Sequence, residues 1–141
     1  EENLTRLCID NIADVLNNIS NKKILFKAQD NTKASYCKKI RKKDSLINFD
    51  DESKNIINKF RAYFVWPGLN FKFKDVTIKI HGLEVTNIKS TGKPGDLYEI
   101  NKSGIYFNTR DIVIVITYLQ FPNKNPISSL DAYNSHREFF K

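Results

Sequence analysis

Apolar residues recur at helical spacing before Pro67 and at every second position after Gly68. The first pattern predicts a helix that begins near Asp50, capped by Asp50 or Asp51, and presents an apolar face formed by Ile56, Ile57, Phe60 and Phe64. The helix should end before Pro67, because the residue before a proline is driven out of helical geometry. The second pattern predicts strands over 69–73 and 76–80.

Further short strands are predicted over 83–88, 97–100, 105–108 and 112–118. Turn residues separate them, at Gly82, at Pro94-Gly95 and at 101–104. The run 112–116 is apolar on both faces, which is typical of a central strand. Closely spaced short strands predict a mainly β fold with flanking helices (α+β), built on a small antiparallel barrel. Ser128, with Asp131 three residues on, should cap a last helix that reaches about Phe139.

Residues 3–19 have the pattern of an amphipathic helix. Its apolar stripe needs a partner surface, either in the rest of the chain or in a preceding domain, and Cys8 should be a core residue within it. The stripe comprises Leu4, Leu7, Cys8, Ile12, Val15, Leu16 and Ile19. A polar stretch from Ser20 to about Lys43 follows and is expected to be a linker. Because the chain opens with Glu1-Glu2 and no Met, we expect a fragment of a longer protein.

The charge balance favours a polyanionic partner. The chain of 141 residues carries 23 Lys and Arg against 16 Asp and Glu, a net charge of +7. Residues 1–37 carry five groups of each sign, so the whole excess lies in residues 38–141. No apolar run approaches the roughly 18 residues that span a bilayer, and two cysteines are too few for a disulfide framework. A reduced, cytoplasmic protein is therefore expected.

The sequence offers little for catalysis. His81 and His136 are far apart and are expected to be solvated, His81 in a turn and His136 on the last helix. No phosphate-binding glycine loop, nucleophile motif or metal-ligand spacing is present. We therefore predict no catalytic residue and no metal site. Lys72, Lys74 and Lys79 should all point off the outer sheet face, where they would either bind phosphate or simply keep that face soluble and block edge pairing.

An ordered set of motifs resembles one family. Residues 57–68, INKFRAYFVWPG, resemble the IRAFNPWPG signature that opens the C-terminal domain of methionyl-tRNA formyltransferases. Upstream, YCKKI with Asp44, Ile47, Phe49 and Asp50 resembles the linker of that family. Downstream, the remaining matches are VTIKI at 76–80, KPGDL at 93–97, NKSGI at 101–105, YLQ at 118–120 and NSHREFF at 134–140.

The resemblance implies three parts: residues 1–20 as the last helix of a preceding catalytic domain, 21–49 as a basic linker, and 50–141 as an OB-like barrel with a leading and a C-terminal helix. It implies an enzyme that transfers a formyl group from 10-formyltetrahydrofolate to initiator Met-tRNA, with this chain inactive alone and holding no cofactor. The expected partners are the initiator tRNA, through its phosphate backbone, and the catalytic domain, with no membrane and no metal. The residues expected to bind nucleic acid are Lys38, Lys39, Arg41, Lys42, Lys43, Arg61, Lys72, Lys74, Lys79 and Lys124.

Departures from the family pattern keep a second hypothesis open. Phe64-Val65 replaces Asn-Pro, the loop after Gln120 keeps one lysine, and Thr109-Arg110-Asp111 replaces a GDG turn. Formyltransferases that act on nucleotide-linked amino sugars have a similar barrel, so the chain could instead be their accessory or dimerisation domain. We expect Trp66 to be a packing anchor rather than a base-stacking platform, and Arg61 to meet either a phosphate or a carboxylate.

Overall fold

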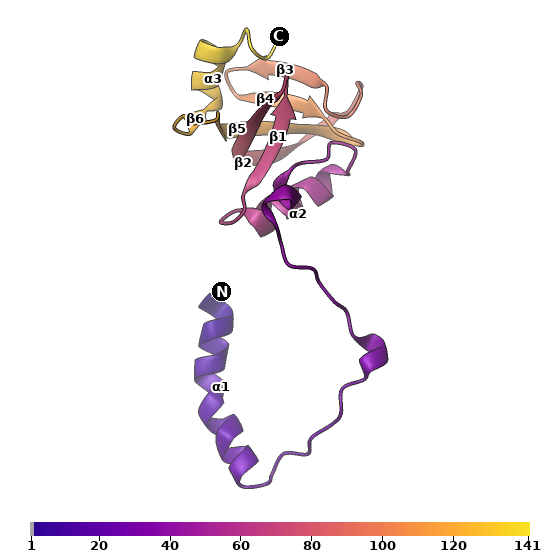
Figure 1. Ribbon diagram of the computed structural model, residues 1–141, viewed down its shortest axis with the longest axis vertical. Coiled ribbons are helices and arrows are strands. Elements are labelled where there is room, and N and C mark those ends of the chain that lie inside the picture. The colour runs from indigo at the N-terminus through magenta and orange to yellow at the C-terminus, as the bar shows by residue number, and fades with distance from the viewer. Residues whose placement is uncertain (1) are drawn as a thin grey trace. The chain divides into compact units, whose positions relative to one another are not determined.

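The computed structural model describes residues 2–141, which divide into two units at Lys38–Lys39. The first unit holds α1 (Glu2–Ser20) and a short 3-10 turn, η1 (Asn31–Lys33), in which the Asp30 side chain accepts a hydrogen bond from the Thr32 amide (Figure 1). The predicted first helix is confirmed. None of its residues is buried, however, and Cys8 is exposed, so the prediction that Cys8 is a core residue is wrong within this unit.

The second unit is an antiparallel sheet of six strands with flanking helices (Figure 1). The strand order is β1-β2-β5-β4-β3, and β6 also pairs with β5. The strands are β1 (Leu69–Phe73), β2 (Val76–Lys89), β3 (Leu97–Asn101), β4 (Gly104–Asn108), β5 (Ile112–Gln120) and β6 (Ile127–Ser128). β5 is central, and its residues from Val113 to Ile116 are buried, as the apolar run predicts. β1 and β3 lie at the two ends of this order and are not paired with each other among residues 2–141, so the barrel is not closed.

The strand β2 continues through Gly82, where the sequence predicts a turn. The pairing with β5 instead shifts register on both sides of Gly82, which marks a bulge in one long strand. A Cβ at Gly82 would overlap Thr117 Oγ1 and approach the Tyr118 amide nitrogen to 3.0 Å. Glycine is therefore required here by the close approach of β5, and His81 lies half-buried on a strand rather than in a solvated turn.

The core is an aromatic and aliphatic layer on the inner face of the sheet. Phe71 and Phe107 are fully buried, with ring centroids 5.2 Å apart, and Phe49 packs 5.3 Å from Phe107. Phe73 joins this cluster to Phe140 at 5.4 Å. Ile47 and Phe49, which precede the first helix of this unit, thus pack with the sheet, and the second unit owes its stability to this layer.

The helix α2 (Ser53–Tyr63) lies at one end of the sheet (Figure 1), and its N-terminus is capped across the fold. Its N-cap is Glu52, not Asp50 or Asp51, and Glu52 makes no side-chain capping bond. The Ser53 amide and hydroxyl instead donate to the two carboxylate oxygens of Asp111, each at 2.9 Å. A carboxylate 58 residues away therefore supplies the acceptor that the sequence pattern assigned to a local aspartate.

The helix α3 (Ser129–His136) begins as predicted. Ser128 caps it, and Ser128 Oγ accepts a hydrogen bond from the Asp131 amide at 3.1 Å. The helix ends at His136, three residues before the predicted Phe139, because Phe139 and Phe140 turn back toward the aromatic cluster. Within residues 2–141, no helix is both long and apolar enough to cross a membrane.

Candidate nucleic-acid interface

A short basic turn lies between the linker and the sheet. The 3-10 turn η2 (Lys42–Ser45) is closed at both ends: the Arg41 amide donates to Asp44 Oδ2 at 2.8 Å, and Ser45 Oγ donates to the Lys42 carbonyl at 2.6 Å. Arg41, Lys42 and Lys43 are all exposed, and none forms an ion pair within residues 2–141. Three free cations are thus held in one defined turn.

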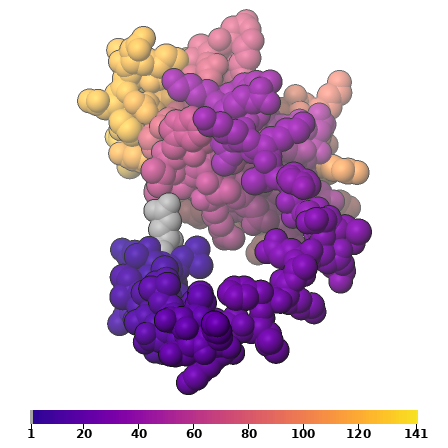
Figure 2. Space-filling view, turned by 60° about the horizontal axis from the view of Figure 1, so that its bottom comes forward, coloured from indigo at the N-terminus to yellow at the C-terminus, as the bar shows by residue number. Residues whose placement is uncertain are grey.

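The basic turn is fixed to the edge of β1 through Asn70. Asn70 Nδ2 donates to Ser45 Oγ at 2.8 Å, and the Ile47 amide donates to the Asn70 carbonyl at 2.7 Å. From α2, Lys59 Nζ donates to the Leu46 carbonyl at 2.9 Å. Figure 2 shows the end of the linker and α2, in purple, lying against the first strands, in pink. The cations of the turn therefore have a fixed position relative to the sheet.

Asn70 also begins a polar row across three strands. In the register of the sheet Asn70 lies opposite Lys79, and Lys79 lies opposite Gln120. These residues alternate with the buried Leu69, Phe71, Ile78 and Ile80, so they lie on the outer sheet face. They line a shallow cleft of about 310 Å³, together with Thr77, Phe121, Pro122 and Asn123.

Gln120 holds the loop that carries Lys124. Its Oε1 lies 3.0 Å from His81 Nε2, and its Nε2 donates to the Lys124 carbonyl at 2.8 Å. Lys124 is exposed and lines a separate pocket, which shares Phe121 with the cleft. The backbone at Lys124 is thus held by the neutral side chain of Gln120.

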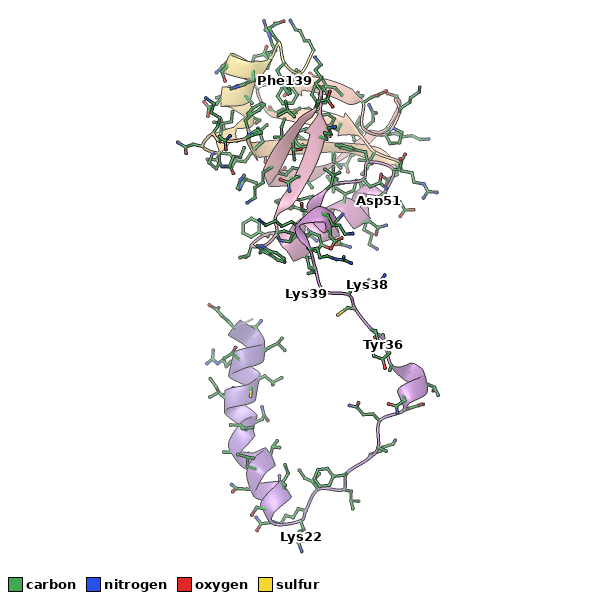
Figure 3. The ribbon with its side chains drawn as sticks, viewed as in Figure 1. Lys22, Tyr36, Lys38, Lys39, Asp51 and Phe139 are labelled. Carbon is green, nitrogen blue, oxygen red and sulfur yellow. The ribbon has the colours of Figure 1, made fainter. Side chains whose placement is uncertain are left out.

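The other expected nucleic-acid-binding residues lie in less defined surroundings. Lys38 and Lys39 are exposed on an extended stretch of chain (Figure 3), and Arg61 is exposed on α2. Lys72 forms an ion pair with Asp75 at 3.0 Å, a surface contact that contributes little to stability. Lys74 is in the β1–β2 turn with φ of 44°, and its Nζ lies 5.7 Å from the Phe73 ring centroid. The alternation predicts that Lys74 shares the outer strand face with Lys72 and Lys79, and the structure shows that it does not.

Trp66 is not the packing anchor that the sequence predicts. It is 53% exposed, and its neighbours Phe64 and Val65 are more exposed still. The apolar face of α2 ends at Tyr63, and the Gly68 amide then donates to the Tyr63 carbonyl at 2.8 Å as the chain turns into β1. Residues 64–66 are consequently exposed to solvent where the chain turns from α2 into β1.

Sequence reasoning missed the residues that organise the surface. Asn70, Ser45 and Gln120 carry no charge, and their role depends on partners 25 and 39 residues away. The alternation of β1 places Asn70 on the outer face, but no local pattern identifies the turn to which it binds. The only signal in the sequence is that a polar residue shares this face with Lys79.

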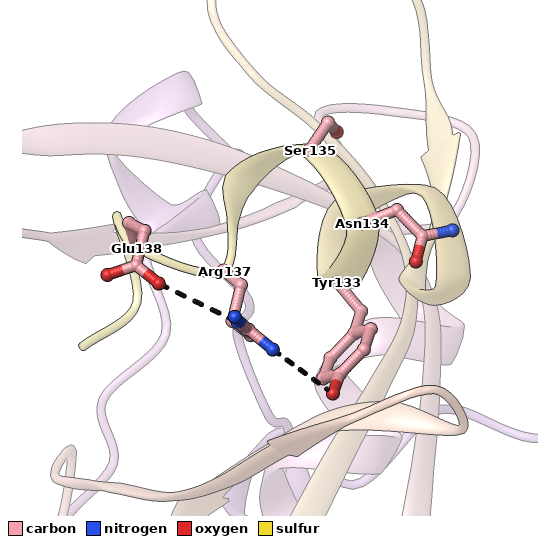
Figure 4. Close-up of a pocket in the computed structure, with 5 residues that line it drawn as sticks. All are labelled: Tyr133, Asn134, Ser135, Arg137 and Glu138. Carbon is pink, nitrogen blue, oxygen red and sulfur yellow. Dashed lines mark hydrogen bonds and ion pairs between the residues drawn. The ribbon is translucent and has the colours of Figure 1, made fainter.

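Polar groups at the end of α3 and in the two residues after it form a second pocket, of about 240 Å³, that offers no activated nucleophile (Figure 4). Arg137 there contacts the Tyr133 hydroxyl at 3.5 Å and Glu138 at 3.7 Å. Ser135 Oγ lies 2.6 Å from His136 Nδ1, but it donates its proton to the Asp131 carbonyl. His136 stacks on Phe121, with centroids 4.4 Å apart, so we assign it a structural role.

No metal site is formed by the residues at hand. Among residues 2–141 the structure contains no group of three or more His, Cys, Asp and Glu side chains that could hold an ion. Among residues 2–141 the one strongly shifted carboxyl is that of Asp111. Desolvation acts to raise its pKa, but hydrogen bonds from Ser53, Thr109 and the Ile112 amide outweigh it and lower the pKa to about 2. Of these partners, Ser53 is the first residue of α2, so this carboxylate serves as the cap of that helix.

The family described as formyl transferase, C-terminal domain, matches residues 39–137, and the chain belongs to this family. It is similar to methionyl-tRNA formyltransferases: 38% identical over 110 residues to that of Finegoldia magna, covering 78% of this chain and 36% of that one. Identity to the enzyme of a Sulfurihydrogenibium species is 35% over 124 residues, covering 87% and 40%. For Thermotoga maritima it is 31% over 135 residues, covering 95% and 42%.

Solved structures with the same fold include HypX from Aquifex aeolicus. A variant of that protein matches with a TM-score of 0.62 at 16% identity, covering 94% of this chain and 24% of that one. HypX in complex with tetrahydrofolic acid matches with a TM-score of 0.59, covering 89% and 22%. The chain thus spans roughly two fifths of the length of the curated relatives described above and about a quarter of these structures.

Proposed function

We propose that the chain is the C-terminal, tRNA-positioning part of a methionyl-tRNA formyltransferase, an enzyme that transfers a formyl group from 10-formyltetrahydrofolate to initiator Met-tRNA. The observation that carries the proposal is the anchored basic turn: Arg41, Lys42 and Lys43 are exposed, unpaired within residues 2–141 and fixed to the strand that faces Lys79. Contacts from lysine and arginine to phosphates set the position of a protein on a nucleic acid, and this turn supplies three such residues.

In this proposal the chain contributes affinity and orientation, and the chemistry resides in the catalytic domain. Lysine and arginine neutralise backbone phosphates and release counterions, which gives binding that weakens steeply with salt. Recognition of particular bases then comes mainly from elsewhere in the enzyme, and the chain alone is inactive. The names of the relatives and the matched family support the formyltransferase assignment.

The folate and the catalytic domain are partners in the same proposal. HypX, which shares the fold, has been crystallised with tetrahydrofolic acid. We propose that 10-formyltetrahydrofolate binds the catalytic domain of the whole enzyme and that no residue of this chain holds it. The exposed stripe of α1, which needs an apolar partner, is consistent with its being the last helix of that domain.

The alternative, an accessory domain of a sugar-nucleotide formyltransferase, has less support. The relatives described above are methionyl-tRNA formyltransferases, and their similarity extends over most of this chain. An accessory or dimerisation domain would also have no need for an exposed cationic turn held rigidly on the sheet.

Binding of the chain to initiator and elongator tRNA across a salt series tests the proposal. We expect saturable binding, with little preference between the tRNAs and a steep salt slope. Replacing Arg41, Lys42 and Lys43 with glutamine should weaken binding to all tRNAs and reduce the slope by about 0.7–0.9 for each phosphate that is no longer neutralised. Extending the replacement to Lys38 and Lys39 should reduce it further.

A matched variant controls for net charge. Lys89, at the end of β2, and Lys93 and Lys102, on the β2–β3 and β3–β4 connections, are exposed, and their replacement with glutamine removes the same charge elsewhere. We expect this variant to lose much less affinity than the variant of the basic turn. Equal losses would mean that binding reflects net charge alone, and no tRNA binding even at low salt would favour the sugar-nucleotide alternative.

A further inference from the structure

The most unusual surface of the second unit is the apolar corner formed by Phe64, Val65 and Trp66. The exposed fractions are 64%, 89% and 53%, respectively. Within residues 2–141 the Trp66 ring makes no stacking or edge contact with another aromatic ring. A large apolar group left in water at a fixed corner is a feature of binding surfaces.

The stretch of chain around this corner, between Glu52 and Glu84, contains almost no negative charge. Residues 53–83 contain six cations, Lys54, Lys59, Arg61, Lys72, Lys74 and Lys79, and a single acidic residue, Asp75. Asp75 is already paired with Lys72 at 3.0 Å. The field at the corner is therefore positive and favours an anionic ligand.

Lys79 brings one of these charges next to Gly68, two residues along the chain from Trp66. A Cβ built on Gly68 would lie 2.6 Å from Lys79 Cε and 3.4 Å from its Nζ. The stem thus occupies the space that glycine leaves open, and the ammonium is held close to Gly68. Within residues 2–141 Lys79 forms no ion pair.

We propose that Trp66 is a stacking platform for an unpaired nucleobase of a bound RNA, with Lys79 binding the adjacent phosphate. The inference rests on the proposed function and adds to it a site that requires a single-stranded segment. An exposed aromatic face next to a cation is the combination by which proteins bind single-stranded nucleic acid, since every base has a face that stacks. Bases within a duplex are already stacked and are unavailable to the indole.

The fluorescence of Trp66 tests this site directly, because it is the one tryptophan in the chain. We expect a short oligoadenylate to quench it in a saturable manner, whereas an RNA duplex binds through phosphates without quenching. Trp66→Ala should weaken oligoadenylate binding roughly 5- to 150-fold, the range for loss of one stacked base, and leave the salt slope unchanged. Trp66→Phe should retain most of the affinity.

Tyr98→Ala is the matched control, since it removes an exposed aromatic ring from β3, outside the corner. It should bind oligoadenylate as the parent chain does. The inference is overturned, with the proposed function intact, if tRNA binds with a steep salt slope but Trp66 is not quenched and Trp66→Ala binds normally. If Trp66→Ala and Val65→Ala instead both abolish self-association of the chain and leave RNA binding unchanged, the corner is a protein contact and the inference is wrong. Absence of any RNA binding overturns both proposals.

Discussion

At the scale of single residues, Asp111 shows how one carboxylate holds two distant segments together. It accepts two hydrogen bonds from Ser53 at the start of α2 and one from the Thr109 hydroxyl. Ser53 and Thr109 are both buried, so water cannot readily replace the Asp111 carboxylate as the acceptor of their hydrogen bonds. Asp111 is itself exposed, and the cap therefore lies at the boundary between solvent and core.

We expect Asp111→Asn to lower the free energy of unfolding by about 1 kcal/mol, the usual effect of losing a helix cap. Urea unfolding of both proteins at neutral pH measures this difference in the free energy of unfolding. Asp50→Asn is the control: Asp50 is exposed and its side chain makes no hydrogen bond within residues 2–141. It should change the stability by less than about 0.5 kcal/mol. If Asp50→Asn lowered the free energy of unfolding more than Asp111→Asn does, the helix would be capped by the local aspartate and not by Asp111.

Protonation of the Asp111 carboxylate makes the free energy of unfolding depend on pH in the acid range. Its pKa is about 2 in the folded chain, against an ordinary value of 3.8. The unfolded chain therefore takes up a proton first as the pH falls, so the stabilisation is complete above about pH 5 and is lost toward pH 2. The stability difference between the parent chain and Asp111→Asn should shrink over this window. A difference that stays constant between about pH 5 and about pH 2 would contradict the assignment.

At the scale of elements, a side-chain hydrogen bond between Asn70 and Ser45 links the basic turn to the sheet. This bond is partly buried and joins η2 to β1 across 25 residues of sequence. The adjacent backbone contact, from the Ile47 amide to the Asn70 carbonyl, does not require either side chain. The side-chain bond therefore orients the turn, while the backbone pairing keeps the segment on the sheet.

We expect Asn70→Ala to cost about 1 kcal/mol of stability, as for one net hydrogen bond, and to accelerate hydrogen exchange at the Asp44 amide. Ser45→Ala should cost more, because it also removes the hydrogen bond from Ser45 Oγ to the Lys42 carbonyl. Because both variants remove the bond between Asn70 and Ser45, the double variant should be little worse than Ser45→Ala alone. Fully additive losses would show that the two residues act independently and that the turn is held by other contacts.

At the scale of the whole molecule, stability resides in the second unit. Its core includes residues from Ile47 to Phe140, and none of the residues of α1 is buried. The boundary found at Lys38–Lys39 leaves this core complete. The proposed division into a last catalytic helix, a linker and a C-terminal domain remains a prediction for the full-length protein.

A chain truncated to residues 39–141 should therefore unfold with the same free energy as the whole chain, within about 0.5 kcal/mol. A second truncation, to residues 50–141, is the informative comparison. It removes Ile47 and Phe49, which pack in the core, and should be destabilised by several kcal/mol. Equal stability of the two truncations would show that the segment 39–49 is only a linker.

The sequence alone predicted the strands other than β6, the central position of β5, the Ser128 cap and the family, because each is recorded in local periodicity or in motifs read along the chain. It failed at Gly82, at the cap of α2, at Cys8 and at Trp66. A bulge and a turn both use glycine, and a cap can come from any carboxylate that the fold brings near. Which apolar residue is left exposed depends on where neighbouring elements end. Only the tertiary structure decided these points, because hydrogen-bond partners and burial are set by contacts between segments that the sequence separates.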